Sequence, residues 1–242
     1  MSKFKPISIK SSLANYQVIF CDEDDFTKFS YESDFFIIDD FFKDTFNNIS
    51  EEKVFWINAS EEAKSYDKFV EIFLSFKQAN LNRESSITAI GGGVIQDIAT
   101  FCASIYMRGI KWNYIPTTFL GMTDSCLGGK SSINVGQYKN LIGNFHPPIK
   151  ILIYPSFIRS LPLIELLAGL SETAKICYCK SNKDFQIYLN LYSELFDGNL
   201  GNHQINSILS HTLLIKKWFI EKDEFDKAER KLLNYGHTWG HA

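Results

Sequence analysis

Two histidines near the end of the chain are spaced like metal ligands. His237 and His241 are four residues apart, so a helix over Leu233–Ala242 would present both imidazoles on one face. Glu172 lies in a separate predicted helix, with Lys175 one turn later on the same face. Two neutral imidazoles and a carboxylate suit a zinc ion with an open coordination position. Histidine pairs of this spacing are more often surface or packing residues, so the spacing alone leaves both interpretations open.

A run of three glycines lies in the sequence context of a nucleotide site. Gly91-Gly92-Gly93 follows a predicted strand and precedes a predicted helix. Glycine allows the backbone to approach a pyrophosphate, and the helix N-terminus offers free N–H groups. Asp97 would lie in the first turn of that helix, where a carboxylate is favoured. Gln96 occupies the place of the third glycine in the dinucleotide-binding fingerprint, so a tight turn without a nucleotide is an equal alternative.

Basic residues gather in particular segments of a chain whose net charge is -3. That charge gives no overall attraction to nucleic acid or to an anionic membrane. Two predicted loops contain Gly128-Gly129-Lys130 and Lys139-Asn140, and Asp124 precedes the first of them. Further cations come from the later predicted helical region, namely Lys175, Lys216 and Arg230. Such groups can hold anionic substrates, but a single lysine is more often a solvated surface charge.

The elements that must position these residues change in character near residue 160. Short buried strands come first, and they are predicted at Tyr16–Cys21, Phe35–Asp39, Val54–Asn58, Ser86–Ile90 and Trp112–Ile115. One helix is predicted over Glu62–Ala79 and another after the glycine run. Later segments have helical periodicity, with helices predicted at Leu163–Cys179, Asp184–Phe196 and Gln204–Glu221. We therefore predict an α/β nucleotide-binding domain with a parallel sheet over residues 1–160, followed by an all-α domain over residues 161–242.

The ends of the chain and its cysteines suggest where the protein works. The chain stops within a motif-like segment, GHTWGHA, so we expect the all-α domain to be incomplete. The first residues contain no apolar stretch suited to a signal peptide, and no run of about 18 apolar residues occurs. The five cysteines form no CxxC pair. These features predict a cytoplasmic protein with reduced thiols and no membrane span.

Together, these segments resemble the 3-dehydroquinate synthase family of sugar phosphate cyclases. GGGVIQD resembles the family signature GGGxxGD, while YMRGI, IPTT, TDSCLGGK and YKNLIGNFHPP resemble its MRG, PTT, DSxxGGK and KNxIGxFxxP segments. AGLSETAK resembles the AGLAExxK helix, and DEFDKAERKLLNYGHTWGHA resembles the DExExGxRxxLNxGHTxGHA run. SEEAK contains the glutamate and lysine of GExxK. The resemblance covers nearly all of the chain, although its first part matches only loosely.

The resemblance implies roles for individual residues. NAD would be held by Asp39, Glu61, Lys64, Gly91, Gly92, Gly93, Asp97, Thr117 and Thr118. Zinc, or cobalt in its place, would be bound by Glu172 and His237, with the family's third ligand in a motif beyond Ala242. The substrate would be surrounded by Asp124, Lys130, Lys139, Asn140, Lys175, Lys216, Arg230, Asn234 and His241. On this resemblance His241 is a substrate contact instead of a metal ligand. Arg108 would reach a substrate phosphate from the partner subunit of a homodimer.

The activity implied by the resemblance is the conversion of a heptulosonate 7-phosphate to a carbocycle with elimination of phosphate, a step of the shikimate pathway to aromatic amino acids. NAD would oxidise a secondary alcohol and later return the hydride, so the cycle would be redox-neutral. The Gly128-Gly129-Lys130 segment and Arg230 favour a carboxylated substrate. Three alternatives remain: a cyclase acting on sedoheptulose 7-phosphate, an NAD-dependent polyol dehydrogenase, and a noncatalytic NAD-binding remnant.

Overall fold

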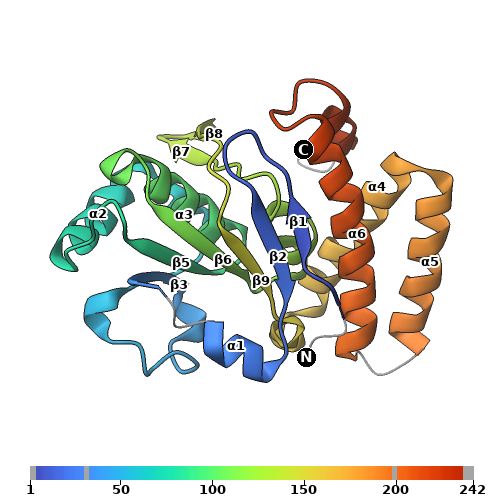
Figure 1. Cartoon of the computed structure of the whole chain (residues 1–242), viewed down its shortest axis with the longest axis horizontal. Coiled ribbons are helices and arrows are strands. Elements are labelled where there is room, and N and C mark those ends of the chain that lie inside the picture. The colour runs from blue at the N-terminus through green and yellow to red at the C-terminus, as the bar shows by residue number, and fades with distance from the viewer. Residues whose placement is uncertain (1–3, 30–32, 198–200, 237–242) are drawn as a thin grey trace.

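A seven-stranded sheet forms the centre of the protein. The computed structural model describes residues 4–29, 33–197 and 201–236. The strands follow the order β1-β2-β9-β6-β5-β3-β4 across the sheet (Figure 1). Their bounds are Ile7–Ile9 (β1), Tyr16–Phe20 (β2), Phe35–Asp39 (β3), Val54–Ile57 (β4), Ser86–Gly91 (β5), Lys111–Pro116 (β6) and Lys150–Ile153 (β9). All neighbouring pairs are parallel except β1 and β2, which confirms the predicted α/β fold with a mainly parallel sheet.

The central strands are buried on both faces. In β3 the four residues Phe35–Ile38 are all buried, and in β5 burial runs from Ile87 to Gly91. Such continuous apolar runs are expected where both faces of a parallel sheet are covered. Helices α2 (Phe69–Gln78) and α3 (Gly93–Ile105) pack on one side of this part of the sheet (Figure 1).

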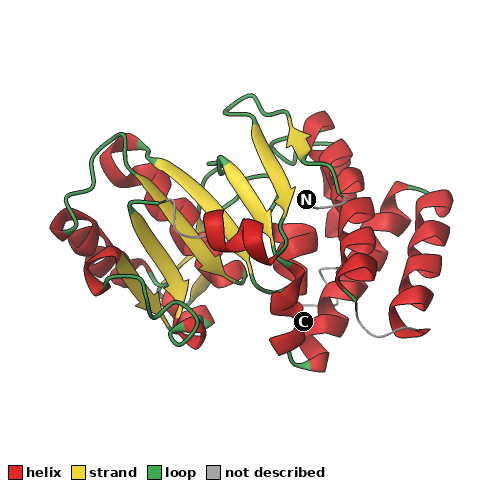
Figure 2. Cartoon of the chain, turned by 60° about the horizontal axis from the view of Figure 1, so that its bottom comes forward, coloured by secondary structure: helices red, strands yellow, loops and turns green. Residues whose placement is uncertain are grey.

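Three long helices follow the last strand of the sheet. They are α4 (Leu163–Lys180), α5 (Asn182–Asp197) and α6 (Asn202–Lys222), and they lie beside the sheet in both views (Figures 1 and 2). Hydrogen bonds join α6 to the first strand and the residue after it: Lys217 Nζ donates to the Ser8 carbonyl at 2.7 Å, and Lys10 N donates to Glu221 Oε1 at 2.8 Å. The division of the chain into domains over residues 1–160 and 161–242 stays a prediction.

Two predictions about local structure were wrong. The helix predicted over Glu62–Ala79 begins only at Phe69, and 3-10 turns at Glu61–Lys64 and Tyr66–Lys68 precede it. The first of these turns is held by tertiary contacts of its side chains, described below. Lys139-Asn140 was predicted to lie in a loop, but it belongs to the strand β8 (Tyr138–Ile142), which pairs with β7 (Ile133–Val135) in a separate hairpin. The strands β1, β7, β8 and β9 had not been predicted.

The described part of the chain contains no helix that is long and apolar enough to cross a membrane. All five cysteines are free thiols in the structure, and Cys179 is the one that is not fully buried. Disulfide bonds therefore do not stabilise this fold.

A glycine in α4 lets this helix approach the turn that follows β6. A Cβ atom added at Gly169 would lie 2.7 Å from the backbone nitrogen of Leu120 and 2.8 Å from Cδ1 of Phe119. Contacts that short to backbone and ring atoms can be relieved only by moving the helix away from the turn. The turn continues into the π-helical segment Gly121–Ser125, which carries Asp124.

We expect Gly169→Ala to destabilise the protein by about 1–2 kcal/mol, because overpacking costs up to about 3 kcal/mol whereas alanine contributes roughly 1 kcal/mol inside a helix. Urea unfolding followed by circular dichroism measures the difference. Ser171→Ala is the matched control, since Ser171 is exposed on the same helix and should change stability by less than about 0.5 kcal/mol. Equal or greater stability of Gly169→Ala would contradict the close approach.

Candidate active site

The carboxyl ends of β5 and β6 form the edge of the sheet where the glycine run lies. Gly91 ends β5 beside Pro116 of β6, and Thr117 N donates a hydrogen bond to the Gly91 carbonyl at 3.0 Å. The helix α3 then begins at Gly93, where an added Cβ would meet no atom within 4 Å. The helix N-terminus therefore opens onto free space at the carboxyl edge of a parallel sheet, where α/β folds bind nucleotides. The glycine turn fits a pyrophosphate.

Three residues predicted to bind NAD or substrate meet around one buried lysine, which is itself a predicted NAD contact. Lys64 is 6% exposed, and its Nζ lies 3.0 Å from Oδ2 of Asp97 and 3.4 Å from Oε1 of Glu61. The same Nζ donates to Oδ1 of Asn140 at 3.1 Å. Asn134 completes the cluster, because its side-chain amide donates to Glu61 Oε1 at 2.9 Å. These contacts join the 3-10 turn after β4, the start of α3 and the β7–β8 hairpin into one polar cluster.

Burial changes the acidity of the carboxylate in this cluster. The pKa of Asp97 is raised from 3.8 to about 6, chiefly because burial disfavours the charged form, while the neighbouring Lys64 ammonium acts in the opposite direction. The folded protein therefore binds a proton at Asp97 more tightly than the unfolded chain does. Through this group, the free energy of unfolding must fall as the pH rises from about 4 to about 6.

Asp97→Asn should remove this pH dependence. Between about pH 4 and about pH 7, we expect the wild type to lose roughly 2–3 kcal/mol more stability than the variant. Urea unfolding at both pH values gives the difference. Glu84→Gln is the control, because this side chain is 88% exposed and should leave the wild-type change intact. If Asp97→Asn and the wild type change by the same amount, the raised pKa is refuted.

A pocket next to this cluster contains five of the residues predicted to contact the substrate. It encloses about 640 Å³ of space that is partly open to solvent. It lies between the start of α3, the π-helical segment, α4, α6 and the segment after α6. Its lining residues are Gln96, Asp97, Asp124, Ser125, Leu127, Lys130, Glu172, Lys216, Asp226, Arg230, Leu233 and Asn234.

An ion pair joins α6 to the π-helical segment at the base of this pocket. Lys216 is 4% exposed, and its Nζ contacts Oδ1 of Asp124 and donates to the Asp124 carbonyl at 2.5 Å. Burial alone would raise the pKa of Asp124, but Lys216, Lys175 and Arg230 hold it below its usual value. Burial lowers the pKa of Lys216, and the carboxylate of Asp124 opposes that shift. The pair therefore depends on mutual contact to remain charged.

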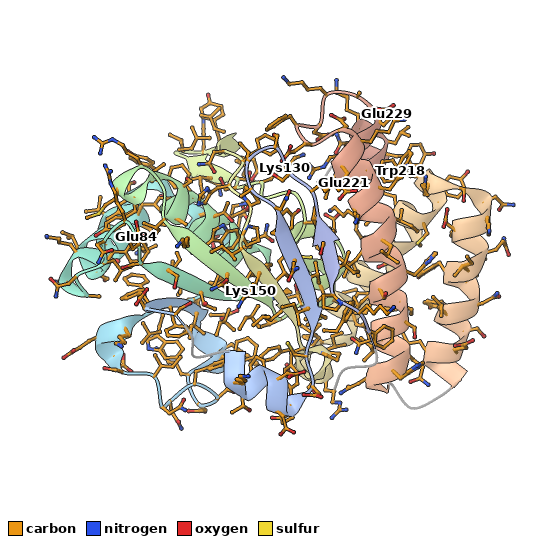
Figure 3. All side chains as sticks on the ribbon, viewed as in Figure 1. Glu84, Lys130, Lys150, Trp218, Glu221 and Glu229 are labelled. Atoms are coloured by element: carbon orange, nitrogen blue, oxygen red, sulfur yellow. The ribbon has the colours of Figure 1, made fainter. Side chains whose placement is uncertain are left out.

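Two more cations reach the pocket. One comes from the loop Gly128-Gly129-Lys130, called the glycine loop below, and the other comes from the segment after α6. Lys130, labelled in Figure 3, has its Nζ 2.6 Å from Oδ2 of Asp226. Arg230 is 5% exposed, and its Nη1 donates to the Glu224 carbonyl at 2.7 Å. The guanidinium lies against Gly128, where any Cβ would collide with Nη2. Gly128 also has a φ of 97°, in the region that favours glycine, so a larger residue would strain the backbone and displace the guanidinium.

The metal site remains a prediction. Glu172 lines the pocket, and its Oε2 lies 2.8 Å from Nζ of Lys175, which confirms that the two share one face of α4. Its carboxylate is a suitable donor for zinc or cobalt. His237 and His241 lie outside the described residues. Within the part of the chain that the structure describes, no three His, Cys, Asp or Glu side chains gather as metal ligands.

Other predicted site residues lie away from this pocket. Arg108 is exposed after α3, with φ of 73° in the left-handed region. Lys139 is exposed on the β7–β8 hairpin. Asp39 ends β3, where its carboxylate accepts a hydrogen bond from Phe41 N at 3.2 Å. Thr118 lies beside the glycine turn, and its Oγ1 accepts from Gly121 N at 3.0 Å.

Five lining residues were not among the predicted site residues, namely Gln96, Ser125, Leu127, Asp226 and Leu233. Asp226, which holds Lys130, was read only as part of the resemblance, although its position four residues before Arg230 was a usable signal. Gln96 was noted only as a missing glycine, yet its side chain is 3% exposed and lines the pocket. No local pattern could have shown that it meets the π-helical segment.

Comparison with known proteins supplies the family. Residues 54–168 match the family described as 3-dehydroquinate synthase N-terminal, and residues 169–242 match 3-dehydroquinate synthase C-terminal. The 3-dehydroquinate synthase of Dictyoglomus thermophilum is 35% identical over 216 residues, which are 88% of this chain and 60% of that protein. The chain thus spans about 60% of the length of this curated relative.

Two solved structures share the fold. One is the 2-epi-5-epi-valiolone synthase of Streptomyces hygroscopicus subsp. jinggangensis 5008 with NAD+ and Zn2+ bound, with a TM-score of 0.81 and 24% identity, covering 98% of this chain and 68% of that one. The other is a 2-deoxy-scyllo-inosose synthase complexed with carbaglucose-6-phosphate, NAD+ and Co2+, with a TM-score of 0.81, 22% identity and the same coverage.

Proposed function

The chain belongs to the 3-dehydroquinate synthase family, and on that premise we propose that it provides the nucleotide-binding part and much of the substrate pocket of a sugar phosphate cyclase. The proposed reaction converts a heptulosonate 7-phosphate to a carbocycle with elimination of phosphate. The cofactors would be NAD and a divalent zinc or cobalt ion. One observation carries the proposal: Lys130, Lys216 and Arg230 converge on one pocket beside a glycine turn that fits a pyrophosphate.

The proposed cofactors supply the redox and Lewis-acid chemistry: NAD, when bound, takes up and returns a hydride, and the metal ion polarises a substrate oxygen. The glycine turn, which is open at Gly93, and the Lys64 cluster would hold the NAD. Glu172 would contribute one ligand to the metal, together with His237, which lies outside the described residues.

The role of the chain's own residues is to bind and orient anions. Lys130 would neutralise a phosphate oxygen, and Arg230 would hold a carboxylate through its planar donors. Asp124 fixes Lys216, so that this ammonium group is held in place before substrate arrives. During elimination, a phosphate oxygen of the substrate takes the proton of a C–H bond and the electron pair of that bond forms the new C=C bond. The C–O bond on the neighbouring carbon then breaks, and its electron pair leaves with the phosphate. A pre-positioned cation stabilises the charge that accumulates on that leaving group.

Two features of the substrate and assembly belong to this proposal. Arg230 and Lys130 together favour a substrate that carries both a carboxylate and a phosphate, as a heptulosonate phosphate does. The exposed position of Arg108 on a left-handed turn suits a residue that serves the pocket of a partner subunit in a homodimer. We also propose that the protein works in the cytoplasm.

Phosphate release tests the proposed function. The full product of the reading frame that carries this sequence is assayed with NAD and zinc, using 3-deoxy-arabino-heptulosonate 7-phosphate and sedoheptulose 7-phosphate side by side. Release from the first alone, without net formation of NADH, supports the proposal. Release from the second alone assigns the protein to the other cyclases, and net NADH assigns it to the polyol dehydrogenases. NAD binding without turnover of either sugar supports a noncatalytic remnant.

A further inference from the structure

We propose that Gln96 is a specificity-determining residue of the pocket, whose carbonyl oxygen accepts a hydrogen bond from a neutral donor group of a bound ligand. The inference rests on the proposed function and concerns a position where this chain departs from the family glycine. The ligand group would be an N–H or O–H, carried either by the carboxamide of the cofactor or by a hydroxyl of the sugar phosphate.

The orientation of the Gln96 amide follows from its hydrogen bond. Nε2 donates to the carbonyl oxygen of Ser125 at 2.7 Å. Only the NH2 end of an amide can face a carbonyl oxygen, so Oε1 must point elsewhere. The side chain is 3% exposed, and Oε1 is buried without a hydrogen-bond partner among the described residues. A buried acceptor without a donor is unfavourable, and such groups in native proteins normally find a partner.

The position of Gln96 makes a ligand a suitable partner. The residue lines the pocket between Asp97, which belongs to the Lys64 cluster, and Asp124, which holds Lys216. It therefore lies where the proposed cofactor and substrate regions meet. Its anchor, Ser125, ends the π-helical segment that carries Asp124, so the amide is tied to the same element as the ion pair.

The chemistry of the pocket gives Gln96 a role in orienting the ligand. A carbonyl oxygen repels phosphate and carboxylate oxygens and attracts N–H and O–H groups. The cations Lys130 and Arg230 have the opposite preference. A ligand with an anionic part and a neutral donor would therefore place its anionic part at these cations and its donor at Gln96. An apolar residue at position 96 would lose this discrimination.

Binding measurements on Gln96→Met test the inference without requiring turnover. Methionine keeps the length of the side chain and removes the acceptor. Calorimetry would compare the full protein and the variant for NAD, for the 3-acetylpyridine analogue that lacks the carboxamide N–H, and for the sugar phosphate. Thr100→Val is the matched control, because Thr100 Oγ1 is another buried oxygen of α3 without a partner, and Thr100 does not line the pocket.

We expect a loss of roughly tenfold in affinity, the size of one hydrogen bond to a ligand. If the cofactor is the donor, the wild type prefers NAD to the analogue and Gln96→Met loses that preference. If the sugar is the donor, only the sugar phosphate binds more weakly to the variant. Unchanged affinities for NAD and sugar phosphate overturn the inference while the proposed function stands. A wild type that binds neither ligand overturns both. If Gln96→Met does not fold, Gln96→Gly, which restores the family glycine and also removes the acceptor, takes its place in the same comparison.

Discussion

Lys130→Ala should slow phosphate release by roughly 10²- to 10³-fold, the usual cost of removing one preorganised group that stabilises charge in a transition state. Lys130 reaches the pocket from the glycine loop, where its Nζ is held 2.6 Å from Asp226. Asp226 positions the ammonium group before a phosphate arrives and leaves it free to form further hydrogen bonds. Because the residues proposed to hold NAD lie around Lys64, the affinity for NAD should stay within about twofold of the wild type.

The measurement is steady-state release of inorganic phosphate, with NAD affinity determined separately. Lys130→Arg keeps the positive charge and should retain more activity than the alanine variant. Lys111→Ala is the control on an exposed lysine, since Lys111 is 57% exposed and lies 3.9 Å from Glu84. Wild-type turnover in Lys130→Ala would remove this lysine from the proposed mechanism, whereas parallel loss of NAD binding would point to a structural role.

Lys216→Met should destabilise the protein by about 3–5 kcal/mol, because the substitution removes the cation in direct contact with the Asp124 carboxylate in a partly buried site. The lysine is 4% exposed and holds both the carboxylate and the carbonyl of Asp124. Its loss should also loosen the contact between α6 and the π-helical segment. Urea unfolding of the wild type and the variant at about pH 7 measures the effect.

A double-mutant cycle separates the ion pair from the packing of the lysine stem. Lys216→Met combined with Asp124→Asn should recover part of the lost stability, since no unpaired charge remains. Lys222→Met is the matched control on the same helix, since the Lys222 side chain is 48% exposed and pairs with Glu229 at 2.6 Å. This pair lies near the surface, so we expect a loss of less than about 1 kcal/mol. Equal losses at both positions would contradict a special role for the buried pair.

Local patterns in the sequence predicted most of the regular structure. The strands β2, β3, β4, β5 and β6 and the helices α3, α4, α5 and α6 appear within a few residues of their predicted bounds. The helices repeat their apolar residues with the helical period, and the strands are short, largely apolar runs such as Phe35–Asp39. Glycine after a strand and before a helix also predicted the turn at Gly91-Gly92-Gly93. These are short-range properties, and the sequence contains them directly.

The family resemblance predicted which residues would be near one another, but not how they are paired. Tertiary structure decided that Lys64 meets Asp97, that Lys216 meets Asp124 and that Lys130 meets Asp226. It also replaced the predicted helix before Phe69 with a 3-10 turn, because the contacts of Lys64 with Asp97 and Asn140 hold that segment against α3 and the hairpin. Helical periodicity carries no information about such distant partners.

The sequence by itself determined the class of fold, the glycine turn and the supply of cationic side chains, because those depend on residue type and on spacing along the chain. Only the tertiary structure decided the order of strands, with β9 between β2 and β6, and the position of Gln96 against Ser125. Those features join residues that are far apart in sequence, and their stability comes from burial and hydrogen bonds that exist only after the chain has folded.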